Sequence, residues 1–133
     1  DIGCGSGILT LASVAMGAPI AYGIDIDNEA LQHSSQNACL NQLDQQCTFC
    51  LPTQFKWKPS SQSVLILMNM IQSEQQIAWA SLPSLHDQPG EYLTSGIRTE
   101  ERHAYLALTD QWGWSLQEEQ EEAGWLAFYF KKI

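Results

Sequence analysis

Three alternating glycines open the chain, and an aspartate follows at a distance that suits a cofactor site. Gly3, Gly5 and Gly7 stand directly before an apolar stretch with helical spacing. Only glycine lets a backbone turn approach a ligand closely, and α/β folds place such loops between a strand and a helix. Asp25 comes eighteen residues after Gly7 and ends the next apolar run, where a carboxylate would accept both ribose hydroxyls. The spacing therefore predicts a site for a nucleoside-containing cofactor, and a plain tight turn is the alternative.

The loop departs from the dinucleotide-binding fingerprint, and a second polar residue follows a later apolar run. The fingerprint requires a third glycine three positions after the second, where this chain has Ile8. Asp27 is explained without a cofactor, because aspartate is a favourable N-cap for the helix expected over 28–41. Asn69 ends the apolar run that begins at residue 64. Its amide could accept a hydrogen bond from a substrate, and the alternative is a turn residue that satisfies local backbone.

Strands and helices are predicted to alternate along the chain, which indicates a doubly wound, mostly parallel α/β sheet with a C-terminal antiparallel hairpin. Residues 1–3 are typical of the end of a strand, so the first strand is expected to be truncated. Pro83 is expected to shorten the third helix, and the acidic run 118–122 to form an exposed edge and turn. The strands are predicted over 20–26, 47–51, 64–68, 91–97, 114–116 and 124–130, the helices over 8–16, 28–41, 73–86 and 99–112, and a surface connection over 52–63.

Composition and charge limit the classes of partner. The chain has 133 residues, six Lys and Arg against fifteen Asp and Glu, a formal net charge of −9 and a pI near 4.5. Such a surface repels nucleic-acid phosphates and attracts a basic protein. No apolar run reaches the ~18 residues that a membrane span needs, and no secretory signal is visible. A cytoplasmic location with reduced cysteines is therefore expected, and the oligomeric state is not predicted.

Two cysteines have the spacing of half a zinc site. Cys47 and Cys50 are three residues apart, but no second pair with suitable spacing exists in the chain. On a strand, residues three apart face opposite sides, unlike the ligands of a chelating knuckle. We therefore predict no metal site.

The chain resembles class I S-adenosylmethionine-dependent methyltransferases, and in particular the PrmA-type lysine methyltransferases of a ribosomal large-subunit protein. The similarity covers nearly the whole chain. Its glycine and acidic motifs are typical of the superfamily, and the motifs around Asn69 and Ser95 point to the family. The residues that carry it are the glycine loop with Ile8-Leu9, the segment 23–27 with Ala30, Asn37-Ala38 before Asn41, Asn69, Pro89-Gly90, Ser95-Gly96-Ile97 and Gly124-Trp125-Leu126.

The resemblance implies one catalytic domain over residues 1–133, with the substrate-recognition domain of the family outside this sequence. It implies S-adenosylmethionine as the cofactor. Asn69 is the catalytic residue that it implies. The family usually has an acidic residue for the adenine amino group after the third strand, where this chain has residues Leu51-Pro52-Thr53-Gln54. The implied cofactor contacts are Asp1, Gly3, Gly5, Gly7, Asp25, Ile26 and Asn69.

The implied reaction is methyl transfer to lysine and α-amino nitrogens of a ribosomal protein. Free lysine has a pKa of ~10.4, so deprotonation at pH 7 costs about 4–5 kcal/mol, which an amide cannot provide as a base. Asn69 would instead accept a hydrogen bond from the neutral amine. Nucleobase methylases carry Pro-Pro and an aromatic residue after this position, whereas Met70-Ile71-Gln72 follow here. Two alternatives stay open: another protein or small-molecule amine as acceptor, and a truncated, catalytically silent domain.

Overall fold

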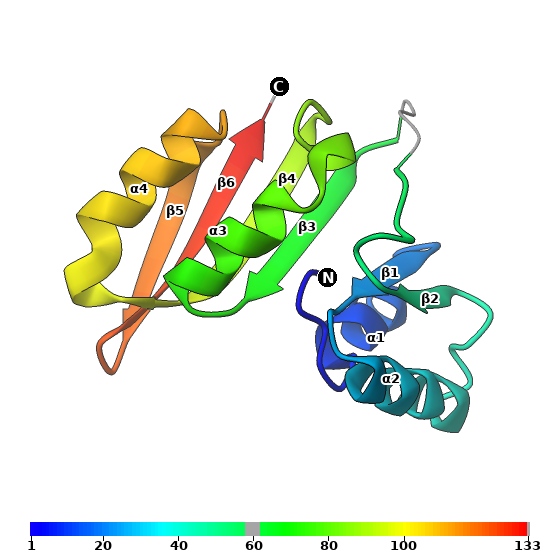
Figure 1. Cartoon of the computed structure of the whole chain (residues 1–133). Helices are drawn as coiled ribbons and strands as arrows, with labels where there is room; N and C mark the ends of the chain where they lie inside the picture. Colours follow the sequence, from blue (N-terminus) through cyan, green and yellow to red (C-terminus); the bar gives the residue numbers. More distant parts are fainter. Residues whose placement is uncertain (58–61, 133) are drawn as a thin grey trace. The chain divides into compact units, whose positions relative to one another are not determined.

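The computed structural model describes residues 1–57 and 62–132 and contains two compact units (Figure 1). The first unit is Asp1–Phe55, and the second unit is Lys56–Ile133. Residues 58–61 of the predicted connection over 52–63 lie outside the described part of the chain. Each unit has its own sheet and its own helices. The prediction of one catalytic domain over residues 1–133 stays a prediction.

The first unit contains α1 (Ile8–Ala15), β1 (Ala21–Ile24), α2 (Asn28–Leu40) and β2 (Cys47–Cys50). β1 and β2 pair in parallel, from Ala21 opposite Cys47 to Ile24 opposite Cys50. Ile2 forms a parallel bridge with Ile24, as expected of the end of a strand that leads into the glycine loop. The first unit therefore places the chain's opening residues beside the end of β1.

α1 buries a different face from the one that its apolar pattern suggests. Thr10 and Val14 are its buried residues, whereas Ile8 is 69% exposed. The reason is a polar contact, because the Asp1 carboxylate accepts hydrogen bonds from both the Thr10 backbone N–H and its hydroxyl. α2 begins as predicted, with the Asp27 side chain accepting a hydrogen bond from the Glu29 N–H at 2.9 Å.

The second unit contains a four-stranded sheet in the order β3-β4-β6-β5. β3 and β4 are parallel, and the other two pairings are antiparallel. The helix expected over 73–86 ends at Ala80, and a separate helical turn starts at Pro83. The elements are β3 (Val64–Asn69), α3 (Gln72–Ala80), η1 (Pro83–Leu85), β4 (Gly90–Arg98), η2 (Thr99–Glu101), α4 (Arg102–Gln111), β5 (Ser115–Glu122) and β6 (Trp125–Lys132).

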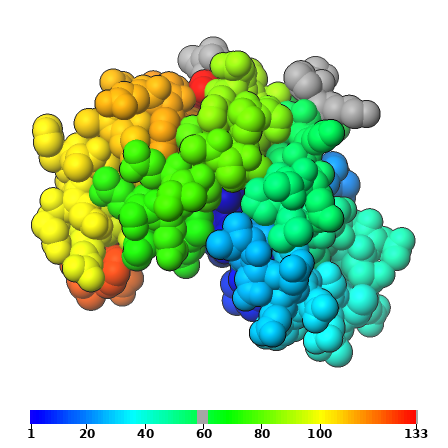
Figure 2. Space-filling model, viewed as in Figure 1, coloured from blue at the N-terminus to red at the C-terminus, as the bar shows by residue number. Residues whose placement is uncertain are grey.

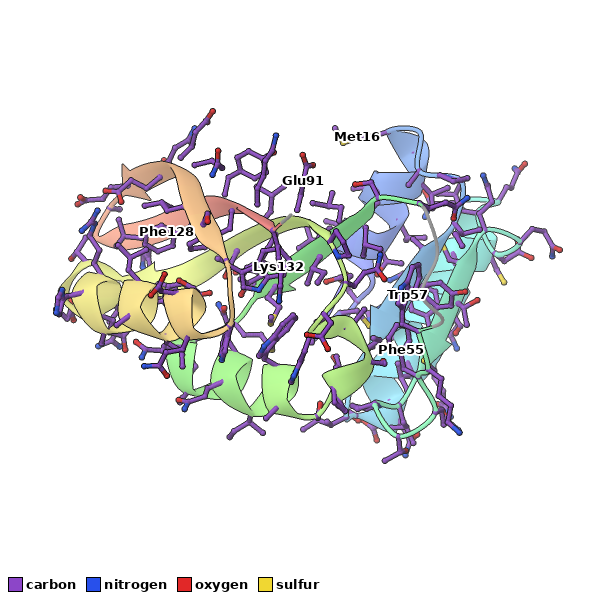
Figure 3. The ribbon with its side chains drawn as sticks, turned by 90° about the horizontal axis from the view of Figure 1, so that it is seen from above. Met16, Phe55, Trp57, Glu91, Phe128 and Lys132 are labelled. Atoms are coloured by element: carbon purple, nitrogen blue, oxygen red, sulfur yellow. The ribbon has the colours of Figure 1, made fainter. Side chains whose placement is uncertain are left out.

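α3 and α4 cover one face of this sheet (Figure 1), and their residues form the surface on that side of the unit in the space-filling view (Figure 2). Alternate strand residues point to that face and form an aromatic core, in which the Tyr105 and Phe128 rings stack at 5.5 Å and those of Tyr92 and Phe130 at 5.6 Å. On the opposite face Leu93 is 43% exposed, and Figure 3 shows Glu91 pointing away from the helices. β3 also alternates, so it is less uniformly buried than its apolar sequence suggests.

The acidic run 118–122 corrects one prediction. It lies within β5, an edge strand whose side chains are all exposed, rather than in the turn before β6. The turn consists of Ala123 and Gly124, whose φ angles of 50° and 83° suit a tight two-residue hairpin. Exposed carboxylates protect an unpaired strand edge from pairing with other chains, so the predicted edge role fits this position. Among the described helices, none is long and apolar enough to cross a membrane.

Candidate functional site

The glycine loop, residues 3–7, connects the Ile2 bridge to α1. Gly3, Gly5 and Gly7 have φ angles of 72°, 53° and 81°, a region that side chains other than glycine rarely adopt. The backbone N–H groups of Gly3 and Cys4 both donate to the Ile24 carbonyl, at 2.7 and 3.1 Å. The three alternating glycines are thus required by the path of the loop, which is anchored to the end of β1.

Asp25 lies against this loop, as the eighteen-residue spacing predicts. One oxygen of its carboxylate, Oδ2, accepts a hydrogen bond from the Gly5 N–H at 2.9 Å. The other, Oδ1, accepts from the Asp27 N–H at 3.0 Å. The side chain is only half-buried, and each carboxylate oxygen has a second lone pair for another donor. The geometry therefore leaves Asp25 able to accept two hydroxyl groups, and its role in cofactor binding stays a prediction.

Asp1 contacts α1 rather than open space. Its Oδ2 accepts from the Thr10 N–H at 3.0 Å and from the Thr10 hydroxyl at 2.8 Å. Thr10 is fully buried, so this pair fixes the first turn of α1 relative to the loop. Thr10 did not stand out in the sequence, because threonine in an apolar helix carries no signal of a partner nine residues away.

Phe49 supports the glycine loop from β2. A Cβ atom at Gly7 would lie 3.2 Å from the Phe49 ring and 2.7 Å from the Cβ of Ser34. A Cβ atom at Gly23, in β1, would lie 2.4 Å from the same ring. Around Gly5, by contrast, a Cβ would meet no atom within 4 Å. Gly7 and Gly23 are therefore packed against neighbours, whereas Gly5 faces open space. Ile26 directly follows Asp25 and is 85% exposed, so an apolar side chain is available beside the carboxylate.

The charges of the first unit fit a cationic ligand. All six Lys and Arg residues of the chain lie beyond Phe55, so residues 1–55 contain none, whereas they include five Asp and Glu. The phosphate-binding P-loop combines backbone N–H groups with a lysine side chain. S-adenosylmethionine has no phosphate and carries a sulfonium charge, so the residues around the loop fit it better than a nucleotide.

Cys4 is not equipped for thiol chemistry. Burial, and then the negative charge of Asp25, raise the pKa of the Cys4 thiol from 9.0 to about 11, so it stays protonated at neutral pH. Within residues 1–57 and 62–132, no three or more His, Cys, Asp and Glu side chains are grouped so as to hold a metal ion.

Asn69 ends β3 in the second unit, where it contacts Ser95 of β4. The two residues are opposite each other in the parallel register, and the Ser95 hydroxyl donates to Asn69 Oδ1 at 2.9 Å. Next to this contact, Gly96 approaches the Met70 backbone closely: its φ is 91° and a Cβ there would lie 2.6 Å from the Met70 carbonyl oxygen. The residues 69–71, here called the Asn69 turn, therefore pack against β4 beside Gly96, where the pairing of β4 with β6 is irregular.

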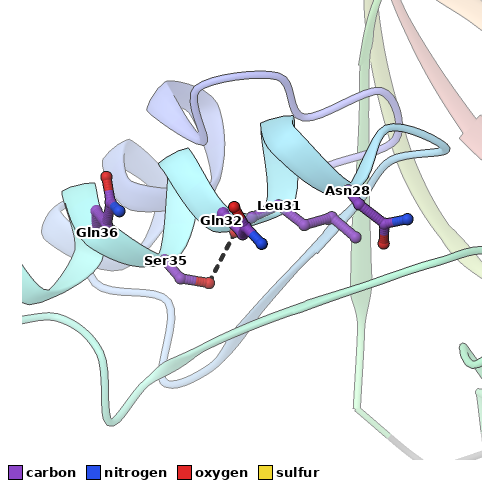
Figure 4. Close-up of a pocket in the computed structure, with 5 residues that line it drawn as sticks. All are labelled: Asn28, Leu31, Gln32, Ser35 and Gln36. Carbon is purple, nitrogen blue, oxygen red and sulfur yellow. Dashed lines mark hydrogen bonds between the residues drawn. The ribbon is translucent and has the colours of Figure 1, made fainter.

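A surface pocket lies on α2, apart from the residues described above (Figure 4). In it the Ser35 hydroxyl donates to the Leu31 carbonyl at 2.8 Å. Its lining includes no ionisable side chain, so we assign it no chemical role. The lining residues are Asn28, Leu31, Gln32, Ser35 and Gln36.

Two of the solved structures with a similar fold are described as methyltransferases. The crystal structure of ribosomal protein L11 methylase from Lactobacillus delbrueckii subsp. bulgaricus superimposes with a TM-score of 0.80 at 20% identity, over 100% of this chain and 68% of that one. A SAM-dependent methyltransferase from Aquifex aeolicus gives 0.73 at 18% identity, over 100% and 80%. The chain thus has the fold of S-adenosylmethionine-dependent methyltransferases, which confirms the predicted fold class.

Sequence similarity defines the family. The profile of the family described as ribosomal protein L11 methyltransferase (PrmA) matches residues 1–133, and the chain belongs to this family. The ribosomal protein L11 methyltransferase of Neisseria meningitidis serogroup B is 33% identical over 125 residues, which are 94% of this chain and 40% of the relative. The ribosomal protein L11 methyltransferase of Chromobacterium violaceum is 35% identical over 112 residues, which are 84% of this chain and 36% of that relative. The chain spans about 40% of the length of the curated relatives it matches.

Proposed function

We propose that this chain is the cofactor-binding and catalytic part of an enzyme that methylates lysine and α-amino nitrogens of a ribosomal large-subunit protein. Membership of the PrmA family supports the reaction class. The observation that carries the proposal is the Asp25 carboxylate, bonded to the Gly5 N–H at 2.9 Å in a unit without Lys or Arg. This arrangement suits a ribose attached to a cationic group and is unfavourable for a nucleotide phosphate.

The residues of the first unit would hold S-adenosylmethionine. Asp25 would accept the two ribose hydroxyls, and Ile26 would cover one side of the base. Gly3, Gly5 and Gly7 would leave room for the amino-acid tail, and Asp1 would hold α1 and the loop in place through Thr10. When bound, S-adenosylmethionine supplies a methyl group on a sulfonium, which an amine nitrogen takes by in-line displacement.

Asn69 would orient the acceptor amine. The Ser95 hydroxyl occupies one lone pair of Asn69 Oδ1 and leaves the other for an amine N–H. A lysine must lose its proton to solvent before it reacts, at a cost of about 4–5 kcal/mol at pH 7, because no amide can remove it. The contribution of Asn69 is thus alignment of a nitrogen that is already neutral.

Charge indicates the kind of partner. The net charge of −9 would attract a basic ribosomal protein and disfavour stable binding of nucleic acid. A cytoplasmic location, where such a substrate is made, follows from the same proposal.

Calorimetric titration of the chain with S-adenosylmethionine tests the cofactor site, with ATP as an anionic comparison. We expect binding of S-adenosylmethionine and none of ATP. Asp25→Ala should weaken binding by ~1–3 kcal/mol, because the ribose hydroxyls would lose their acceptor. Asp44→Ala is the matched control, since Asp44 is an exposed carboxylate of the same unit. Unchanged affinity in Asp25→Ala would refute the ribose assignment, and the absence of any binding would refute the proposed function.

The acceptor is tested separately. Incubation of the enzyme with S-adenosylmethionine and a mixture of ribosomal proteins, followed by mass spectrometry, should show 14-dalton additions (one methyl for one hydrogen) on lysine or α-amino nitrogens of one large-subunit protein. Additions on RNA, or on small amines alone, would contradict the proposed substrate.

A further inference from the structure

We propose that Gln75 is a positioning residue for Asn69. Its buried amide binds the backbone carbonyl of Met70, the next residue in the chain, and that of Ser95 on the neighbouring strand. This inference rests on the proposed function of Asn69. Gln75 lies on α3, within the core of the second unit, and its side chain is fully buried. Burial of an amide is unfavourable unless its donors and acceptor all find partners, so the partners of Gln75 indicate what the residue does.

Both N–H groups of Gln75 are directed at the Asn69 site. Nε2 donates to the Met70 carbonyl at 2.7 Å and to the Ser95 carbonyl at 3.0 Å. Met70 follows Asn69 in the chain, and Ser95 is the residue whose hydroxyl donates to Asn69 Oδ1. One amide thus joins the end of β3 to the partner strand that orients the Asn69 side chain.

Hydroxyl groups fix the orientation of this amide from its other side. Gln75 Oε1 accepts from Tyr92 Oη at 2.7 Å, from Thr94 Oγ1 at 2.9 Å and from Tyr105 Oη at 2.5 Å. Burial raises the pKa of Tyr105 to about 12 and that of Tyr92 well above 10, so both remain hydrogen-bond donors at neutral pH. A flipped amide would direct its oxygen at two carbonyls, so only one orientation is compatible with these partners.

An apolar residue at position 75 would pack in this core but would not hold the turn. Both carbonyls would lose their donor, and the Asn69 turn would keep only its backbone register and the Ser95 hydroxyl. Small displacements of an aligning group reduce the rate of an in-line reaction strongly. The expected role of Gln75 is therefore to restrict the motion of residues 69–71.

Gln75→Met tests this role by NMR relaxation of the backbone amides of residues 69–71. We expect order parameters near 0.85, the value of rigid backbone, in the natural chain and below about 0.6 in the variant. Gln88→Met is the matched control. Gln88 is also buried, but its Oε1 accepts from Trp57 Nε1 at 3.0 Å and not from a group of the Asn69 turn. Equal order in Gln75→Met and Gln88→Met would overturn the proposal.

Gln75→Glu keeps the test decisive if Gln75→Met does not fold. A protonated glutamic acid keeps one acceptor oxygen and donates one hydrogen bond to a carbonyl, whereas a carboxylate repels both carbonyls. The titratable groups facing position 75 are Tyr92 of β4 and Tyr105 of α4. Burial favours the neutral acid, so order at residues 69–71 should be retained at low pH and lost as pH rises. Order that does not change with pH would contradict the proposal.

Kinetics separate this inference from the proposed function. With ribosomal proteins as methyl acceptors, kcat of Gln75→Glu relative to the natural chain should fall by about tenfold or more over the pH range in which residues 69–71 lose order. The Kd for S-adenosylmethionine should change much less, because all the implied cofactor contacts except Asn69 belong to the first unit. An unchanged kcat would overturn the positioning role. If the natural chain transfers no methyl group, the proposed function fails, and the relaxation measurement still decides whether Gln75 restrains the Asn69 turn.

Discussion

The glycine loop and the Asn69 turn are positioned by different kinds of interaction. In the first unit, the backbone determines the geometry of the glycine loop. Three glycines adopt positive φ angles, and two carboxylates accept hydrogen bonds from backbone N–H groups. In the second unit, one buried amide and three hydroxyl groups hold the turn from within the core. The geometry of the glycine loop depends on glycines at positions with positive φ, and that of the Asn69 turn depends on side chains buried in the core.

The two units also differ in charge and in side-chain composition. All Lys and Arg residues and all five tryptophans belong to the second unit, and all four cysteines belong to the first. Tryptophan fluorescence therefore reports only on the second unit, and labelling of the buried thiol of Cys4 reports only on the first. These two probes allow the unfolding of each unit to be measured separately in one molecule.

The largest effect is expected from Phe128→Ala. Phe128 is buried, stacks on Tyr105 and lies 5.7 Å from the Phe130 ring, so its truncation leaves a cavity in the aromatic core (Figure 3). We expect a loss of about 3–5 kcal/mol in the free energy of unfolding, measured by tryptophan fluorescence in urea. Leu93→Ala, at a half-exposed position, should lose less than about 1.5 kcal/mol. Equal losses would show that the core of the second unit is not what stabilises it.

Gly7→Ala is the corresponding change in the first unit. Its cost combines a left-handed backbone, about 1–2 kcal/mol, with a clash against the Ser34 side chain, so we expect about 2–4 kcal/mol in all. Gly5→Ala shares the left-handed backbone but meets no neighbour, and should cost only about 1–2 kcal/mol. Protection of the Cys4 thiol against alkylation in urea measures both. A larger cost at Gly5 than at Gly7 would contradict the packing described for the loop.

The first unit was predictable because its geometry is local or depends on glycine. Positive φ angles require glycine, so the alternation of Gly3, Gly5 and Gly7 indicated the loop, and a fixed spacing indicated Asp25. The Asp27 cap followed from residue type alone. Thr10 and Phe49 were missed, because a residue that packs beneath a loop has no characteristic type.

The second unit was predictable in its elements and not in its interior. Gln75 stands in the polar run Gln72-Ser73-Glu74-Gln75-Gln76, so nothing in its neighbourhood marks it as buried. Its partner Tyr105 is thirty residues away, and only the packing of α4 on β4 brings them together. The expectation of an edge and turn at 118–122 is wrong about the turn for a related reason. Exposed carboxylates suit both a turn and an edge strand, and only pairing with β6 distinguishes them.

A smaller effect is expected from Asp27→Ala. The Asp27 side chain caps α2 through the Glu29 N–H, and loss of an N-cap costs about 1 kcal/mol. Asp27→Asn is the control, because asparagine caps nearly as well and removes only the charge. Urea unfolding followed by Cys4 labelling measures both variants. If Asp27→Asn cost as much as Asp27→Ala, the charge rather than the cap would be responsible.

The smallest effect concerns pH. Burial and the charge of Asp25 raise the pKa of Cys4 from 9.0 to about 11, so the folded state favours the neutral thiol. The stability that this group contributes is complete below pH 9 and is lost as pH rises from 9 to 11. The Tyr92 and Tyr105 pKa values are raised as well, so their loss of stability above pH 10 belongs to the second unit and appears with or without Cys4.

Comparison with Cys4→Ala isolates the thiol. Both proteins should lose stability in alkali, measured by circular dichroism in urea, and the natural chain should lose more between pH 9 and 11. At neutral pH the difference between them should be constant, because the thiol is protonated in both the folded and the unfolded state. Parallel pH profiles across the whole range would mean that neither burial nor Asp25 raises the pKa of Cys4 in the folded state, and would contradict the burial of this thiol in the glycine loop.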